Sequence, residues 1–295
     1  MTKPNTPTIL ITGATGNIGT QLTKQLAARK VPFRVMVRSI KDAETFSEME
    51  GAEAVIGDFN DVETIAAALQ GIERAFLLTN SSEQAEAQQK AFVDEAARAE
   101  VKQIVKLSQW AADENSPVRF LRYHAAVEDK IKNSGIAYTF LRPNLFMQGL
   151  LGFRDSIAGQ GKFFAAIGDA KISVVDVRDI AAVAGAALTE DGHTGKIYNL
   201  TGPEALTHQA IAEKLSHALD CPIQFVDVPP EAMRESLRKV GFPVWQLNGL
   251  IEDYAHYARG EAASVESGIE DATGKQPHSF AEFARDYAPV FSQST

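Results

Sequence analysis

The chain has 295 residues, 45% of them hydrophobic and 23% charged, which is the composition of a folded globular protein of one or two domains. Its net charge of −9 argues against a protein that coats nucleic acid or an anionic membrane. The single cysteine, Cys221, excludes an internal disulfide and is typical of a reducing compartment. No signal segment or membrane span is visible, so we expect a cytoplasmic protein with neither a membrane nor a nucleic-acid partner.

Short β-rich runs alternate with helical patterns through the first 145 residues. Several runs are almost continuously apolar, as expected for strands covered on both faces. The predicted strands are 8–12, 33–38, 53–58, 74–79, 103–108 and 137–142. The predicted helices between them are 19–30, 61–71, 86–100 and 124–135, the last ended by Gly135. This alternation predicts an α/β fold with a doubly wound parallel sheet.

The rhythm loosens after Leu145, where a glycine-rich segment at 148–170 indicates loop and short helix. Thr207 is the expected N-cap of a later helix. The other elements predicted here are strands at 172–177, 196–201 and 223–228 and helices at 178–188 and 208–219. We therefore expect one domain at 1–150 with about 171–202, and a smaller lobe at about 151–170 and 203–295.

The segment LITGATGNIGT, residues 10–20, places Gly13, Gly16 and Gly19 three residues apart between a predicted strand and a predicted helix. In a doubly wound sheet this turn binds the pyrophosphate of a dinucleotide, because glycine lets phosphate approach and the helix N-terminus offers free amides. A glycine-rich turn without a ligand is the alternative, and the strand–turn–helix context favours the cofactor. The predicted cofactor contacts in this turn are Gly13, Thr15, Gly16, Asn17 and Ile18.

Arg38 follows the second predicted strand, where enzymes that use NAD usually carry an acidic residue for the ribose hydroxyls. A guanidinium at this place suits a 2′-phosphate, and Lys41 adds a second cation. The alternative is a solvated loop charge. We predict NADPH as the cofactor in preference to NADH.

Five segments of the chain resemble the NmrA-like branch of the atypical short-chain dehydrogenase/reductase superfamily. They are ITGATGNIG, VRS, GDFND, YTFLRPNLF and the ending GKQPHSFAEFARDY. The resemblance spans essentially the whole chain. It implies a Rossmann-like sheet with a smaller C-terminal α/β lobe, and the activity of the bacterial NADPH-dependent reductases of quinones and dyes. It also implies cofactor contacts: Asp58 and Phe59 beside the adenine; Leu78, Thr79 and Asn80 beside the ribose; Ser108, Gln109, Pro143, Asn144, Leu145 and Phe146 around the nicotinamide.

The acid–base pair of ordinary short-chain dehydrogenases, Tyr-x-x-x-Lys, is absent, because Val127 stands four residues after Tyr123. Alcohol–ketone interconversion is therefore in doubt. The same predicted helix carries His124 and Glu128, which share a face at a spacing of four. We predict that His124 donates a proton and that Glu128 orients and charges it. A surface imidazole with a helix partner is the alternative.

Aromatic and apolar residues in the loop segments suggest a pocket for a flat aromatic substrate. The predicted substrate contacts are Trp110, Phe146, Met147 and Phe163. Core packing between the two domains is the alternative for most of them. The six histidines have no metal-ligand spacing, so no metal site is expected. The sequence leaves two functions open, an NADPH-dependent reductase and a non-catalytic NADP(H) sensor with a protein partner, and it leaves a homodimer open.

Overall fold

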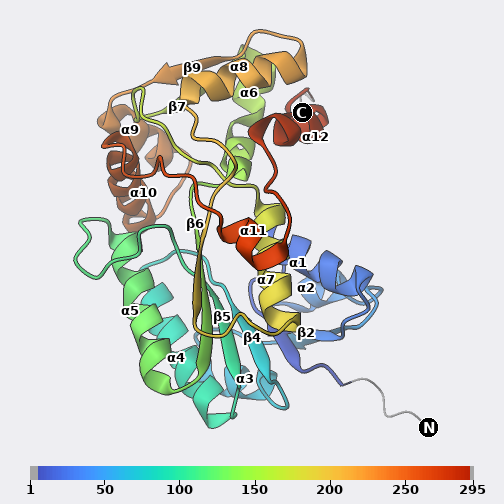
Figure 1. Ribbon diagram of the computed structural model, residues 1–295. Coiled ribbons are helices and arrows are strands. Elements are labelled where there is room, and N and C mark those ends of the chain that lie inside the picture. The colour runs from blue at the N-terminus through green and yellow to red at the C-terminus, as the bar shows by residue number, and fades with distance from the viewer. Residues whose placement is uncertain (1–5, 293–295) are drawn as a thin grey trace. The chain divides into compact units, whose positions relative to one another are not determined.

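The computed structural model describes residues 6–292, which form two compact units (Figure 1). Unit 1 consists of the residues up to Glu114, Leu121–Arg142 and Ile180–Tyr198. Unit 2 consists of Asn115–Phe120, Pro143–Asp179 and the residues from Asn199 onward. Segments 143–150 and 171–179, which we assigned to the first domain, thus belong to unit 2.

A seven-stranded sheet runs through unit 1. Its order is β3 (Ala52–Ile56), β2 (Phe33–Val37), β1 (Ile9–Ile11), β4 (Arg74–Leu77), β5 (Gln103–Leu107), β6 (Ala137–Pro143) and β8 (Lys196–Leu200). Each neighbouring pair from β3 to β6 is parallel. The predicted Rossmann-like α/β fold is confirmed, and the carboxyl ends of these strands form one edge, where such sheets bind ligands.

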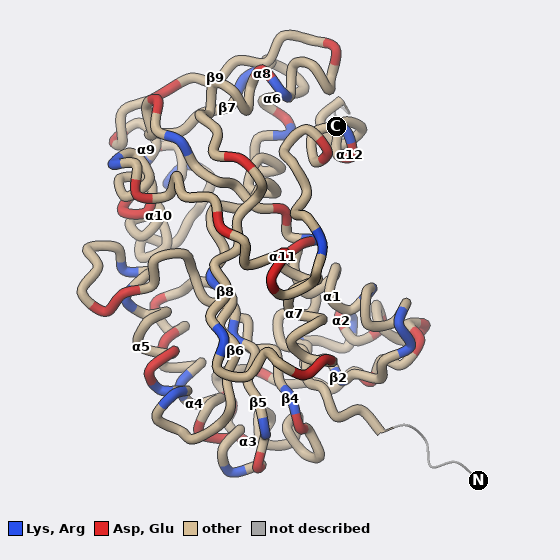
Figure 2. Tube along the Cα trace, in the orientation of Figure 1, with Lys and Arg blue, Asp and Glu red and all other residues tan. Residues whose placement is uncertain are grey.

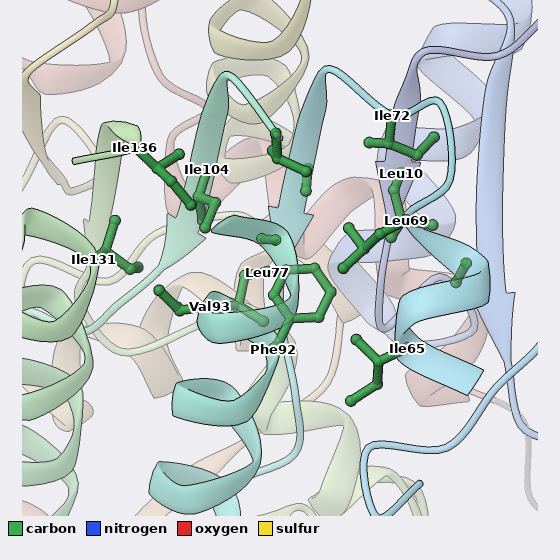
Figure 3. Close-up of a cluster of buried hydrophobic side chains, with 14 of the residues drawn as sticks. Leu10, Ile65, Leu69, Ile72, Leu77, Phe92, Val93, Ile104, Ile131 and Ile136 are labelled. Atoms are coloured by element: carbon green, nitrogen blue, oxygen red, sulfur yellow. The ribbon is translucent and has the colours of Figure 1, made fainter. Parts of the chain in front are cut away.

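Helices flank this sheet. They are α1 (Asn17–Ala28), α2 (Ile40–Glu44), α3 (Val62–Ala68), α4 (Ala85–Arg98), α5 (Arg119–Ser134) and α7 (Val177–Thr189). All of them except the short α2 bury apolar residues. One core cluster joins Ile65 of α3, Phe92 of α4 and Ile131 of α5 to Leu10 and Ile104 of the sheet (Figure 3). It fixes α3, α4 and α5 on one face, and so fixes the residues that α5 presents near the strand ends.

Unit 2 is mainly helical. Its elements are the 3₁₀ helix η1 (Met147–Phe153), α6 (Arg154–Gln160), β7 (Lys162–Ala165), α8 (His208–Leu219), β9 (Gln224–Asp227), α9 (Pro230–Lys239), α10 (Val244–Ala258), α11 (Gly268–Thr273) and α12 (Phe280–Ser292). The strands β7 and β9 pair in parallel, with Phe163 opposite Phe225. We expected only loop and short helix over 148–170, so β7 is an addition.

Two helix boundaries agree with the sequence prediction, and one predicted strand is wrong. Thr207 caps α8 by accepting a hydrogen bond from the Ala210 amide, and Gly135 follows α5 with φ of +79°. The run 172–177 is not a strand of the sheet. It makes two isolated bridges, Ile172 to Leu206 and Val175 to Phe146, and a run that changes partner after one residue builds no ladder.

Charges of both signs are interspersed along the chain (Figure 2). Among residues 6–292 there is no helix long and apolar enough to cross a membrane.

Candidate active site

The turn between β1 and α1 has the backbone of a phosphate site. Gly13 has φ of +65°, and a Cβ on Gly19 would lie 2.2 Å from the Gly13 carbonyl oxygen, so both positions require glycine. Gly16 is different, since a Cβ there would meet only that oxygen, at 3.4 Å. Gly16 is the N-cap of α1, and no described side chain caps its amides. These residues fit a pyrophosphate, which would supply the missing acceptors.

Arg38 is exposed directly after β2, and within residues 6–292 no carboxylate forms an ion pair with it. The nearest acidic residue in the sequence, Asp42, is used locally, because its carboxylate accepts the Ser39 hydroxyl at 2.7 Å. A guanidinium without a carboxylate partner suits a phosphate. That Arg38 holds the 2′-phosphate of NADPH stays a prediction.

The other predicted cofactor residues follow strand ends along the same sheet edge. Asp58 forms a local turn by accepting the Asn60 amide at 2.8 Å, and Phe59 packs on Phe92 with ring centroids 5.8 Å apart. The Thr79 hydroxyl accepts from Gln89 at 2.7 Å. Asn144 differs, because its side chain serves unit 2, where it donates to the Ala262 carbonyl at 2.9 Å.

A buried polar cluster lies at the carboxyl ends of β5 and β6. Nζ of Lys106 is 2.8 Å from Nδ1 of His124 on α5 and donates to the Leu107 carbonyl at 2.9 Å. The carboxylate of Glu128, which is 1% exposed, accepts the Ser108 hydroxyl at 2.5 Å. It also accepts two bonds from the Arg142 guanidinium, at 2.9 and 2.5 Å. The three side chains bonded to Lys106 and Glu128, those of His124, Ser108 and Arg142, are therefore fixed.

Burial and neighbouring charge set the protonation of this cluster. Burial lowers the pKa of Lys106 to about 7, with Glu128 acting to raise it and Arg142 to lower it. Burial, then the charges of Lys106 and Arg142, hold the pKa of His124 well below its usual range, so this imidazole is neutral. When the Lys106 ammonium donates to Nδ1, the proton of the neutral ring must be on Nε2. The cluster thus makes His124 a hydrogen-bond donor through Nε2.

Unit 2 contains an apolar cavity of about 60 Å³. Met147, Phe153, Phe163 and Phe164 line it, together with Leu145 and Phe146. Phe163, one of the predicted substrate residues, is almost fully buried, and its neighbour Phe164 lines the cavity as well. Trp110, the remaining predicted substrate residue, belongs to unit 1.

Comparisons with known proteins agree with this geometry. The model of the NmrA-like family matches residues 5–286. The chain belongs to the NmrA-like family. A relative named NAD(P)H azoreductase, from Xenophilus azovorans, is 33% identical over 96% of this NmrA-like chain and 99% of its own length.

Two solved structures of reductases are similar to this NmrA-like protein throughout. The NADPH-dependent quinone oxidoreductase of Escherichia coli, complexed with NADPH, has a TM-score of 0.85 and 26% identity, over 94% of this chain and 99% of that chain. The triphenylmethane reductase of Citrobacter sp., complexed with NADP(H), has a TM-score of 0.83 and 26% identity, over 95% and 99%.

The structure corrects one part of the predicted acid–base pair in this NmrA-like chain. We expected Glu128 to orient and charge His124. Instead Ser108 and Arg142 occupy the carboxylate, while Lys106 holds the imidazole and, with burial, keeps it uncharged. The expected contact failed because a shared helix face does not decide which side chains of neighbouring strands intervene. The catalytic role of His124 stays a prediction.

Sequence reasoning missed Lys106 and Arg142. One signal was present, because Lys106 is the only charged residue in the run QIVKLS, which we predicted to be a buried strand. A lysine in a strand covered on both faces must find partners or lose its charge. Lys130 lies seven residues after Tyr123 and forms an ion pair with Asp94 at 2.5 Å. It therefore does not replace the lysine of the Tyr-x-x-x-Lys pair that this chain lacks.

Proposed function

We propose that this protein is an NADPH-dependent reductase of quinones, dyes or related aromatic acceptors. The observation that carries the proposal is the buried contact of 2.8 Å between Nδ1 of His124 and Nζ of Lys106, which leaves the neutral ring its proton on Nε2 when Lys106 is protonated. A neutral donor at the carboxyl end of a Rossmann-like sheet can stabilise charge that develops on an acceptor oxygen. The reductases among the relatives supply the reaction class.

The cofactor would be held by the turn at Gly13 and Gly16 and by the cation of Arg38. When bound, NADPH supplies a hydride. The open space at Gly16 leaves room for the pyrophosphate, and Arg38 selects the 2′-phosphate by charge. The remaining predicted contacts at the strand ends, from Asp58 to Phe146, position the rest of the cofactor.

His124 and Lys106 would complete the reduction of a quinone by moving protons. A quinone that gains a hydride needs one more proton to become a hydroquinone, and Nε2 of His124 donates it. Lys106, whose pKa is about 7, passes its own proton to Nδ1 as Nε2 releases its proton. Nε2 then takes up a proton from solvent and Nδ1 returns its proton to the Lys106 amine, which restores the neutral ring with its proton on Nε2. A cationic triphenylmethane dye is neutralised by the hydride alone and does not need this transfer.

The second candidate is a non-catalytic sensor of NADP(H) that binds a protein partner. It would use the same glycine turn and Arg38. It gives no reason for Lys106, whose pKa burial lowers to about 7, to share a hydrogen bond with the neutral His124, an arrangement that an acid–base pair needs. The proposed enzyme gives that reason, so we favour it.

The test is NADPH consumption by the purified protein with a panel of quinones and triphenylmethane dyes, with NADH measured in parallel. The expected result is oxidation that depends on the acceptor and prefers NADPH. Gly16→Val is the negative control, because a Cβ here would meet only the Gly13 carbonyl oxygen, at 3.4 Å, and the side chain would stand where the pyrophosphate approaches. NADPH binding with no oxidation by any acceptor would contradict the enzyme and favour the sensor.

A further inference from the structure

Two buried histidines in unit 2, His208 and His256, each have a side-chain nitrogen without a hydrogen-bond partner among the described residues, and of the two it is His208 that lines the cavity described above. His208 is 4% exposed, and its Nδ1 is fully buried with no hydrogen-bond partner among the described residues. A buried polar atom without a partner costs on the order of 1–3 kcal/mol, so its retention calls for an explanation. The ring of His208 lies in the wall of the 60 Å³ cavity described above.

The rest of the cavity wall is aromatic or aliphatic. The ring of His208 lies 5.1 Å from Phe225 and 6.1 Å from Phe163, centroid to centroid. Besides His208, Tyr254 is the one lining residue with a polar side-chain group of hydrogen-bonding strength. Such a wall suits a flat ring, and its two polar side chains suit one oxygen atom on that ring.

The charge state of His208 restricts the ligand to a neutral group. The residue is the first of α8, where the positive end of the helix dipole disfavours a cation. Burial lowers its pKa to about 4, against a smaller opposing effect of Asp227. A neutral imidazole either accepts or donates at Nδ1, depending on its tautomer. It therefore suits a phenol or hydroquinone hydroxyl in one tautomer and a quinone carbonyl in the other.

The volume limits how much of the ligand enters. A cavity of about 60 Å³ is less than half the ~150 Å³ of an apolar cavity that admits benzene, so it takes the oxygen-bearing edge of a ring and not a whole ring. Water alone is a poor occupant, because a buried water makes about three hydrogen bonds and this wall offers few polar atoms. Leu145 and Phe146, which line the cavity, also belong to the segment expected to border the nicotinamide.

We propose that this cavity binds the oxygen-bearing edge of a phenol or quinone ring, with Nδ1 of His208 as its hydrogen-bonding partner. As a substrate site it rests on the proposed function, which it deepens by naming the acceptor class and the residue that selects it. The binding itself does not depend on turnover.

The experiment is an NMR titration of the ¹⁵N-histidine-labelled protein, without cofactor, with phenol and with toluene. Phenol should shift the ring nitrogens of His208 saturably, and toluene, which has the same shape without the hydroxyl, should bind at least tenfold more weakly. His193 is the internal control, because its Nδ1 is already 2.9 Å from the Tyr198 hydroxyl and its signals should not move. His208→Phe, which keeps an aromatic ring against Phe163 and Phe225, should lose the preference for phenol.

Equal binding of phenol and toluene, or no shift at His208, would overturn the proposal. Kinetics of the same variant separate its failure from that of the proposed function. With quinones, His208→Phe should raise KM at least tenfold and leave kcat within a factor of about three. If the unchanged protein reduces quinones while phenol does not shift the ring nitrogens of His208, the proposed binding site is wrong and the proposed function stands. If His208 responds to phenol but no acceptor is reduced, the reductase is wrong and the binding site stands.

Discussion

Each unit of this protein buries a neutral histidine, His124 in unit 1 and His208 in unit 2. The two side chains have different surroundings. His124 in unit 1 is hydrogen-bonded to a lysine within a cluster of charged groups. His208 in unit 2 is packed between aromatic rings, and its Nδ1 has no partner among the described residues. A histidine with its partner in place is prepared to act on a proton. A histidine without one is prepared to bind, because a ligand relieves the cost of the unpaired atom.

The largest expected effect tests whether the charged cluster of unit 1 is a buried unit. Glu128→Ala removes the carboxylate that offsets Arg142 and Lys106, and breaking a buried ion pair costs about 3 kcal/mol or more. Urea unfolding should show that loss. Asp129→Ala on the same helix is the matched control, because its partner Lys132 is 3.1 Å away on the surface and such pairs contribute about 1 kcal/mol or less. Similar losses in both variants would mean that the cluster is solvated.

The next effect concerns catalysis by His124. His124→Gln should slow quinone reduction about 100-fold, the lower range for losing a general acid. The same variant should reduce a cationic triphenylmethane dye at nearly the rate of the unchanged protein, since that product needs no proton. Steady-state rates with the two acceptors make the comparison, and NADPH affinity is measured alongside. An equal slowing for both acceptors would show that His124 shapes the site and transfers no proton.

A smaller effect should appear as the pH falls, because of His208. Its pKa is lowered to about 4 in the folded protein, so the unfolded chain binds the proton first as pH falls through 6.5. Its contribution to stability is thus present above pH 6.5 and is lost between pH 6.5 and 4. Linkage puts that loss at about 2 kcal/mol between pH 7 and pH 5.

Urea unfolding at pH 7 and pH 5 measures this effect. The His208→Phe variant should lose about 2 kcal/mol less than the unchanged protein over that interval. The control is His217→Gln, an exposed position on the same helix, which should lose as much as the unchanged protein. If His208→Phe and His217→Gln lose the same unfolding free energy between pH 7 and pH 5, the imidazole of His208 is solvated and water binds its Nδ1.

The smallest effect distinguishes the charged site of unit 1 from the uncharged cavity of unit 2. Arg38→Ala should weaken NADPH binding about tenfold, the low end for an exposed charge-assisted contact, and leave NADH binding unchanged. Added salt should weaken NADPH binding to the unchanged protein but not phenol binding, because no charged side chain lines the cavity. Fluorescence titration measures both. Lys24→Ala, another exposed cation of unit 1, is the control and should change neither.

The sequence was sufficient wherever the signal was local. A few adjacent residues and backbone preferences fix each of these local features. They are the glycine turn before α1, the alternation of strand and helix, the Thr207 cap and the position of Arg38 after β2. Those signals predicted the fold and the cofactor edge. The run at 172–177 failed because an apolar, β-branched segment has no local feature that tells a sheet strand from one that changes partners.

The candidate site required tertiary structure because its contacts cross between elements. Spacing of four on a helix suggested that His124 and Glu128 interact, but the lysine of β5 and the arginine of β6 intervene, at separations of 18 and 14 residues. Likewise no periodicity indicates that the first residue of α8 lies against Phe163 and Phe225. The sequence by itself determined the fold and the place of the glycine turn, because these depend on backbone and neighbours. Only the tertiary structure decided which buried groups are paired, because pairing depends on which strand ends and helix faces meet.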